Sequence, residues 1–584
     1  MLDKLRYIFD HKQKLGLIWI LFLVVVGSLI ELLGVSVFLP FVQILIDPNS
    51  VRENEMLRFF YEMLGFGNIR SFLCAIALLI IFVYLFKNVY LMLEQNAILK
   101  FSYQTRMNLA TRLLGTYMSE PYSFHLNKNI ADLTGSIQYD ANQFMLLVNA
   151  ALQLFAEMAV ILCLGIYLFH TSHSITLVIM GLLVVSFMIF FVISKKVSQR
   201  LGKQNEAYNA KLYQWINQSL GGIKEVKVLG REGFFVDSYK EVYKKLIKGA
   251  KNNELIAAVP KYFIETVCMV GMLLAVIIKM YWGQNNIEVF ALQLSAFAVA
   301  AFRLMPSAGK VSAYINSIMY GKPSLDLIYN DLKSVEGCNI TDFDRKKDIG
   351  ALTLGDRIRI ENLSFKYADS DTCVLEHINI EIKRGQTVAL IGSSGAGKTT
   401  LADLILGLHK PTEGRISVDG TDISENMDAY HKMLGYIPQS IYLSDDSIKN
   451  NIAFGIREEE IDDEAVKEAM KKAQIYDFVM SLENKENTFA GDRGVRLSGG
   501  QRQRIGIARA LYYDPEVLVL DEATSALDNE TETAVMEAIE SLHGQKTMII
   551  IAHRLTTIKK ADVIYRIDAG SAKEVSKSEV FEDN

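Results

Sequence analysis

A glycine-rich stretch, GSSGAGKT at residues 392–399, contains the residue types that bind phosphate. It follows the apolar run TVALI, which predicts a buried strand, and precedes LADLILG, which predicts a helix. Glycines let backbone N–H groups approach phosphate oxygens, and the helix N-terminus adds positive potential. We expect Lys398 to reach the β- and γ-phosphates of a nucleotide and Thr399 to hold Mg²⁺. The expected phosphate-binding residues are Gly392, Ser393, Ser394, Gly395, Ala396, Gly397, Lys398, Thr399 and Thr400.

A second apolar run, VLVLDE at residues 517–522, ends in two carboxylates. Asp521, at the end of the predicted strand, is expected to bind Mg²⁺ through its water shell, and Glu522 to act as general base on the attacking water. Gln439, after GYIP, and His553, after TMIIIA, follow two other predicted strands. Alone, either could be an ordinary loop residue. Together with the carboxylates they are assigned to catalysis, and Gln439 also to the nucleotide and Mg²⁺.

The stretch LSGGQ, about 20 residues before the acidic pair, resembles the signature of the ATP-binding cassette family. The family's other motifs occur around it in the family's order. The resemblance implies that Tyr367, in LSFKY, stacks on adenine and that SALD at 525–528 forms the loop between two composite sites. One departure is Asp492, in TFAGDRG, where the family's exporters more often have Glu; this position concerns coupling between domains and not ATP chemistry.

The resemblance also implies a dimer, because in this family the signature of one cassette completes the phosphate site of another. The residues that would reach across to the γ-phosphate are Ser498, Gly499 and Gly500, and Gln501 of the same signature is also assigned to nucleotide binding. They would supply a hydroxyl, backbone N–H groups and a helix N-terminus. Since the chain has one phosphate loop and one signature, we expect a homodimer with two equivalent ATP sites.

Composition places part of the chain in a membrane. The chain has 584 residues, of which 50% are hydrophobic, and a net charge of only -5, which argues against a nucleic-acid-binding surface. Its five cysteines indicate neither a zinc site nor a disulfide framework. Six apolar runs are long enough to span a bilayer. They lie at about 15–39, 70–93, 143–169, 175–194, 256–282 and 288–306.

Lys and Arg gather before the first run and after the second and fourth, so both chain ends are expected in the cytoplasm. We therefore predict a multi-pass protein of the bacterial inner membrane. Its expected fold is an all-α six-helix transmembrane domain of exporter type (1–330), a linker (331–349) and an α/β nucleotide-binding domain (350–584). Helix-compatible sequence continues past the second and fourth spans, and the loops beyond, 120–125 and 222–232, are expected to be coupling helices. An external amphipathic helix is expected within about 51–66, with half-buried packing as an equal alternative.

Three cations stand inside the predicted spans: Lys87, Lys261 and Arg303, the last within AFAVAAFRLMPSAGK at 296–310. Each costs on the order of 3 kcal/mol if it faces lipid at the bilayer centre, which favours a cavity-facing position. In a dimer they would form a belt suited to a phosphate or pyrophosphate. Lys87 and Lys261 could instead snorkel to the inner interface. Glu31, in the first span, could pair with such a cation or line the exit.

The membrane region also resembles the bacterial flippases for lipid-linked oligosaccharides of protein N-glycosylation, through RLMPS at 303–307, AAVP at 257–260, Glu31 and the external stretch. The resemblance implies transport of a polyprenyl-pyrophosphate oligosaccharide to the outer leaflet. Lys stands at 87 and 261, where the family tends to have Arg, so charge is kept but bidentate phosphate geometry is lost. The alternatives are an exporter of another amphipathic lipid or drug and, less favoured, an ATP-gated channel or regulator.

Overall fold

A computed structural model of the chain describes most of its residues, some of them, including 301–305, by backbone alone. The described residues are 1–37, 41, 44–45, 48, 51, 55–63, 65–66, 68–171, 173–282, 287–334, 352–367, 370–521, 529–552 and 558–582. The chain divides into two compact units. The first comprises Met1–Glu120 and Asn127–Asp344, and the second Pro121–Leu126 and Arg345–Asn584.

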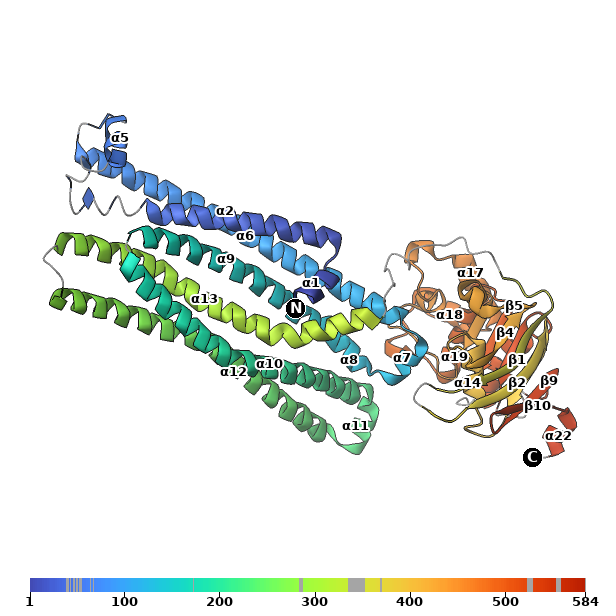
Figure 1. The fold of residues 1–584 in the computed structure, drawn as a ribbon. Coiled ribbons are helices and arrows are strands. Elements are labelled where there is room, and N and C mark those ends of the chain that lie inside the picture. Colours follow the sequence, from blue (N-terminus) through green and yellow to red (C-terminus); the bar gives the residue numbers. More distant parts are fainter. Residues whose placement is uncertain are drawn as a thin grey trace. The chain divides into compact units, whose positions relative to one another are not determined.

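The first unit is helical, and its long helices lie on the predicted spans (Figure 1). Its elements are α1 (Leu2–Ile8), α2 (His11–Ser36), α5 (Glu55–Met63), α6 (Ile69–Ser119), α8 (Ile130–Gly135), the π-helical turn η1 (Ser136–Asp140), α9 (Ala141–Thr171), α10 (His173–Gly221), α11 (Ile223–Leu229), α12 (Glu232–Trp282) and α13 (Ile287–Ser334). Helices α9 and α13 run between the α2–α6 pair and the α10–α12 pair (Figure 1). Within the described part, His11–Gly34, Ile69–Ser119 and Ile130–Tyr167 are long and apolar enough to cross a bilayer.

Several helices extend further than their apolar runs predict. The fifth span is the C-terminal part of α12, which begins at Glu232, and the sixth belongs to α13, which continues to Ser334. Neither Pro260 in α12 nor Pro306 in α13 ends its helix. A proline removes one backbone hydrogen bond, but packing against neighbouring helices keeps a long helix continuous past it.

The expected coupling loops are short helices, and the external stretch contains α5. Residues 120–125 overlap α7 (Tyr122–Asn127), and 222–232 contain α11. On α5 the side chains of Phe59, Phe60 and Met63 are exposed by 60%, 41% and 59%, whereas the ring of Tyr61 packs against that of Phe72 at 5.2 Å between centroids. The amphipathic helix and half-buried packing both stay predictions.

The second unit contains two sheets, built on strands β1 to β10. An antiparallel sheet has the order β2 (Leu375–Lys383), β1 (Arg357–Phe365), β4 (Glu413–Val418), β5 (Thr421–Asp422). The other has the order β10 (Ser571–Val575), β9 (Val563–Asp568), β3 (Thr387–Ile391), β8 (Thr547–Ile551), β7 (Val517–Asp521), β6 (Leu434–Ile437). In the second sheet every pairing except β9–β10 is parallel. All residues of β3, β7 and β8 are buried, as expected for continuous apolar runs covered on both faces.

Helices cover this second sheet. They are α14 (Lys398–Ile405), α15 (Met427–Lys432), α16 (Ile448–Ile452), α17 (Asp463–Lys472), α18 (Tyr476–Ser481), α19 (Gly499–Leu511), α20 (Asn529–Glu540) and α22 (Lys577–Glu582), with short 3-10 turns between some of them. One apolar core joins the antiparallel sheet to β3 and α14, and another joins the parallel sheet to α16–α19. Both cores meet at β3, so the strand before the phosphate loop is held from both sides.

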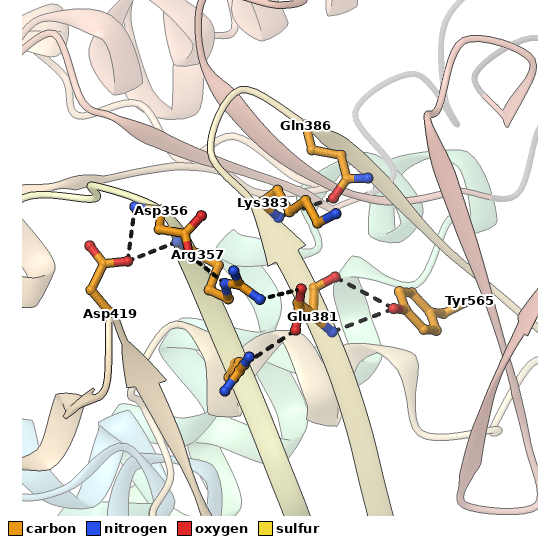
Figure 2. A network of polar contacts seen from close by, with 8 residues as sticks. Asp356, Arg357, Glu381, Lys383, Gln386, Asp419 and Tyr565 are labelled. Carbon is orange, nitrogen blue, oxygen red and sulfur yellow. Dashed lines mark hydrogen bonds and ion pairs between the residues drawn. The ribbon is translucent and has the colours of Figure 1, made fainter.

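A polar network closes the edge where β1 begins (Figure 2). Asp419 accepts hydrogen bonds from the backbone N–H groups of Gly355 (2.6 Å), Asp356 (2.9 Å) and Arg357 (2.8 Å). Partial burial opposes the charge on Asp419, but these donors outweigh it and lower its pKa. On the neighbouring strand, Glu381 accepts from Arg357 at 2.9 Å. The network fixes the register between the start of β1, β2 and the turn after β4.

Candidate nucleotide and substrate sites

The phosphate loop leaves β3 and enters α14. Gly392, Gly395 and Gly397 have φ angles of 151°, 83° and 100°, which residues with a Cβ rarely adopt. A Cβ at Gly392 would lie 2.2 Å from the carbonyl oxygen of Ile567, so the loop passes directly against β9. All three positions therefore favour glycine for the backbone angle, and Gly392 and Gly397 also for the close approach of neighbouring atoms.

Lys398, the first residue of α14, lies over this loop. Its side chain is 6% exposed, and its Nζ donates to the carbonyl oxygens of Gly392 (2.9 Å) and Ser393 (2.8 Å). Ser394 and Thr399 are exposed beside it. An ammonium, a helix N-terminus and an exposed hydroxyl around a glycine turn fit a Mg²⁺-bound triphosphate, with Lys398 on the phosphates and Thr399 on the metal.

The acidic residue and the glutamine predicted for the site lie at one edge of the parallel sheet. Strands β6 and β7 are adjacent and parallel, with Ile437 opposite Leu520. Asp521 ends β7 with 8% exposure, and Gln439 is exposed two residues after the end of β6. Since β3 and β8 also end at this edge, the fold brings the phosphate loop, Asp521 and Gln439 together. Glu522, His553 and the stretch 525–528 lie outside the described residues.

The signature forms the N-terminus of α19. Ser498 caps the helix: its hydroxyl accepts from the backbone N–H of Gln501 at 3.2 Å, and the Gln501 side chain accepts from the N–H of Ser498 at 2.8 Å. This reciprocal capping box fixes the helix end. Ser498 and Gly499 are exposed, and Gly500 is buried. The positive end of α19 is thus presented on the surface of the second unit.

Sequence reasoning missed the anchor of α19. Arg509 donates from Nε to the carbonyl oxygen of Asn451 (2.7 Å) and from Nη1 to that of Tyr442 (2.8 Å), and its guanidinium lies 4.6 Å from the ring centroid of Phe454. The Tyr442 segment follows Gln439 closely, so Arg509 ties the signature helix to the chain after Gln439. No short motif marks this arginine, because its partners lie 58 and 67 residues away in sequence.

The predicted adenine-binding aromatic is anchored to the phosphate-loop helix. The hydroxyl of Tyr367 lies 3.0 Å from Oγ1 of Thr400, the third residue of α14. Its ring packs edge-on against Phe365, with centroids 5.0 Å apart. Tyr367 is therefore held beside the loop, as its expected role on adenine requires.

The predicted substrate residues lie on different helix pairs within the first unit. Lys87 runs past Gly34 between α6 and α2, with its Nζ 4.4 Å from the ring centroid of Tyr84. Glu31 lies one turn before Gly34 and is 3% exposed. Lys261 of α12 is exposed and packs along Gly309 of α13.

The structure therefore does not bring Lys87 and Lys261 to one helix pair. Arg303 lies in α13 and is described by its backbone alone. The proposed belt of cations accordingly depends on the second chain and stays a prediction.

One ion pair in the membrane region was not anticipated. Lys310 of α13 donates to Oε1 of Glu157 of α9 at 2.7 Å, and the carboxylate is 8% exposed. Lys310 ends the apolar stretch that contains Arg303, and Glu157 lies inside the third predicted span. The sequence signal for this pair is that each of the two apolar runs contains a charged residue. The sequence alone does not show that these two runs pack against each other.

Family models for the two parts of an ABC transporter match the two halves of the chain. The family described as "ABC transporter" matches residues 375–525, and "ABC transporter transmembrane region" matches residues 17–302. An ATP-dependent lipid A-core flippase of Cupriavidus metallidurans is 31% identical over 486 residues, which is 80% of this chain and 77% of the relative. A protein of the same name from Escherichia coli is 30% identical over 539 residues, 89% of each chain.

Among solved structures, a bacterial Atm1-family ABC exporter with ATP bound has a TM-score of 0.76. It is 23% identical in sequence, and the match covers 98% of this chain and 97% of the other. At this identity the likeness establishes the fold alone.

Proposed function

Because the chain belongs to the ATP-binding cassette transporter family, as a half-transporter, we propose that two copies form an ATP-driven lipid exporter whose substrate carries a phosphate-containing headgroup. The predictions of an exporter-type fold, of ATP hydrolysis coupled to transport, and of an inner-membrane protein with a cytoplasmic nucleotide-binding domain are confirmed. The homodimer, the Mg²⁺ and the lipid are proposals.

The observation that carries the homodimer is the exposure of Ser498 and Gly499 at the N-terminus of α19. A capped helix N-terminus that is exposed to solvent can bind an anion. Because each chain has one phosphate loop, this helix end can complete the phosphate site of a second copy. In the dimer, Lys398 would hold the phosphates from one chain while Ser498 and the α19 N-terminus bind the γ-phosphate from the other.

Hydrolysis then requires an oriented water. We assign the general base to Glu522, the orientation of the γ-phosphate to His553, and the metal contacts to Thr399, Gln439 and Asp521. When bound, Mg²⁺ neutralises charge between the β- and γ-phosphates. Asp521 supplies the buried acidic group that such a cation favours at this edge.

For the substrate, the finer proposal is a polyprenyl-pyrophosphate oligosaccharide moved to the outer leaflet. It is supported by Lys87, Lys261 and Arg303, because cations in a membrane domain favour an anionic headgroup. The relatives are named lipid A-core flippases, and another amphipathic lipid fits this chain equally well. A cationic drug fits the basic residues less well.

The deciding experiment compares lipids in proteoliposomes. A fluorescent polyprenyl-pyrophosphate glycan, a lipid A core and a neutral polyprenyl glycan are offered to the wild type and to Lys87→Ala, Lys261→Ala and Arg303→Ala. We expect stimulated ATPase and flipping for the pyrophosphate lipid, with losses of at least several-fold in the variants.

Lys244→Ala, an exposed lysine in the cytoplasmic part of α12, is the matched control and should behave as wild type. If the wild type transports the lipid A core in preference to the pyrophosphate glycan, the lipid A core replaces the polyprenyl lipid as the proposed substrate. Wild-type transport in all three cation variants would refute the role of the basic residues.

A further inference from the structure

Helix α7 belongs to the nucleotide-binding unit although it lies between two helices of the membrane unit in sequence. Residues Pro121–Leu126 group with Arg345–Asn584. The ring of Tyr122, the first residue of α7, lies 5.7 Å from the ring of His409, measured between centroids. His409 follows the end of α14, the helix of the phosphate loop. Within the second unit, α7 therefore contacts the imidazole that follows the helix of the phosphate loop.

His409 is the centre of a cluster of aromatic rings. Its centroid lies 5.2 Å from that of Phe365 and 5.7 Å from that of Tyr367, the latter edge-on at 88°. The side chain is 7% exposed, and its Nε2 has no hydrogen-bond partner among the described residues. Burial lowers the pKa of His409, so the imidazole is neutral at cytoplasmic pH and packs as an aromatic ring.

Tyr367 and Tyr122, which both contact His409, lie on segments with different expected roles. Tyr367 is tied to α14 through Thr400 at 3.0 Å and is the residue assigned to adenine. Tyr122 lies on α7, the segment that connects two helices of the membrane unit in sequence. The ring of Tyr367 packs edge-on against His409, and the ring of Tyr122 is tilted against it by 54°, so restraint of one ring restrains its neighbour.

We propose that His409 is a positioning residue that transmits the binding of adenine on Tyr367 to Tyr122, so that α7 becomes ordered in response to the base of the nucleotide and not only to its phosphates. The proposal rests on the nucleotide site described above. Phosphates bound to the loop alone do not cover the ring face of Tyr367, whereas a stacked adenine adds a contact on that face and, through His409, restrains α7.

The test is hydrogen exchange of the full-length protein in detergent, which needs no transported lipid. Backbone exchange is followed for residues 121–127 and, separately, for the phosphate loop. The probes are adenylyl imidodiphosphate, which carries adenine and is not hydrolysed, and inorganic tripolyphosphate, which carries no base. We expect the first to slow exchange at α7 and at the loop at least several-fold, and the second to slow it at the loop only.

In His409→Leu we expect the nucleotide to protect the loop as before while protection of α7 is lost. His409→Phe keeps a ring and should restore it, which separates ring contact from loss of packing volume. Tyr122→Leu should behave as His409→Leu, and Tyr513→Leu, an exposed ring elsewhere in the unit, as wild type.

Equal protection of α7 by tripolyphosphate, or full protection in His409→Leu, would overturn the proposal. An absence of loop protection by either probe in the wild type would instead refute the nucleotide site itself.

Discussion

Lys310 and Glu157 form an ion pair of 2.7 Å that joins α13 to α9 beside Pro306. Its two ends differ: the lysine side chain is 48% exposed and the carboxylate 8%. Oε2 of Glu157 is buried without a hydrogen-bond partner among the described residues. The free-energy cost of desolvation in this pair therefore falls mainly on the carboxylate.

We expect Lys310→Met to destabilise the protein more than Glu157→Gln. The first leaves a buried charge without its cation, and because the lysine is half exposed the cost should be about 1–2 kcal/mol, below that of a fully buried pair. The second leaves an exposed lysine that water can solvate. The measurement is thermal unfolding in detergent, followed by tryptophan fluorescence.

The double variant Glu157→Gln with Lys310→Met should recover most of the stability lost in Lys310→Met. Additive losses in the double variant would show that the two side chains contribute separately, against the ion pair as a unit.

Glu522→Gln should lower ATP turnover by roughly 10²–10⁴-fold while ATP binding is retained, because the amide keeps the shape of the carboxylate but cannot accept the proton of the water. Phosphate release and equilibrium binding of a fluorescent ATP analogue measure the two effects. Glu516→Gln, which changes a carboxylate at the opposite end of β7, is the control and should turn over normally. Normal turnover in Glu522→Gln would require another base.

The cassette was predictable from sequence because its chemistry resides in short local patterns. A glycine loop between a strand and a helix, or a capping serine before α19, is readable without knowing the rest of the fold. The contacts of His409, Arg509 and Glu157 were not, since each depends on residues brought together from distant parts of the chain. Helix ends were also missed: hydropathy marks where the bilayer is crossed, whereas α12 and α13 continue as long as packing partners are present.

The composite site makes a prediction about mixed dimers. One chain carries Lys398→Ala and the other Ser498→Arg, and each alone should be inactive. In the mixed dimer, the intact phosphate loop of the second chain faces the intact signature of the first, so one complete site is restored.

We therefore expect coexpression of the two variants with different tags, followed by tandem purification, to yield measurable ATPase activity. The control places both substitutions in one chain and pairs it with a wild-type chain, which leaves neither site complete and should give less activity. If the control matches or exceeds the coexpressed pair, the signature does not act across the dimer.

The buried carboxylate of Asp140 gives the structure a pH dependence. Asp140 ends the π-helical turn η1, before the apolar run 143–169 that is predicted as the third span, and accepts a hydrogen bond from Ser324 of α13 at 2.5 Å. Burial raises its pKa from 3.8 to about 7, helped by the charges of Glu206 and Asp331, while the Ser324 hydroxyl opposes the shift. Asp331 is in turn bonded to the hydroxyl of Tyr117 at 2.6 Å.

Because the folded protein holds the Asp140 proton more tightly than the unfolded chain, this stabilisation is complete at acid pH and is lost as the pH rises toward and through about 7. We expect the apparent Tm of the wild type to decrease by several degrees between about pH 5 and pH 8. In Asp140→Asn, which is neutral throughout and still accepts from Ser324, the decrease should be smaller. Some slope remains, since the pKa of Asp331 and that of Glu206 are also raised by burial.

Asp237→Asn, on the cytoplasmic part of α12, is the matched control and should keep the full slope of Tm against pH. An unchanged slope in Asp140→Asn would show that this carboxyl is already ionised at acid pH.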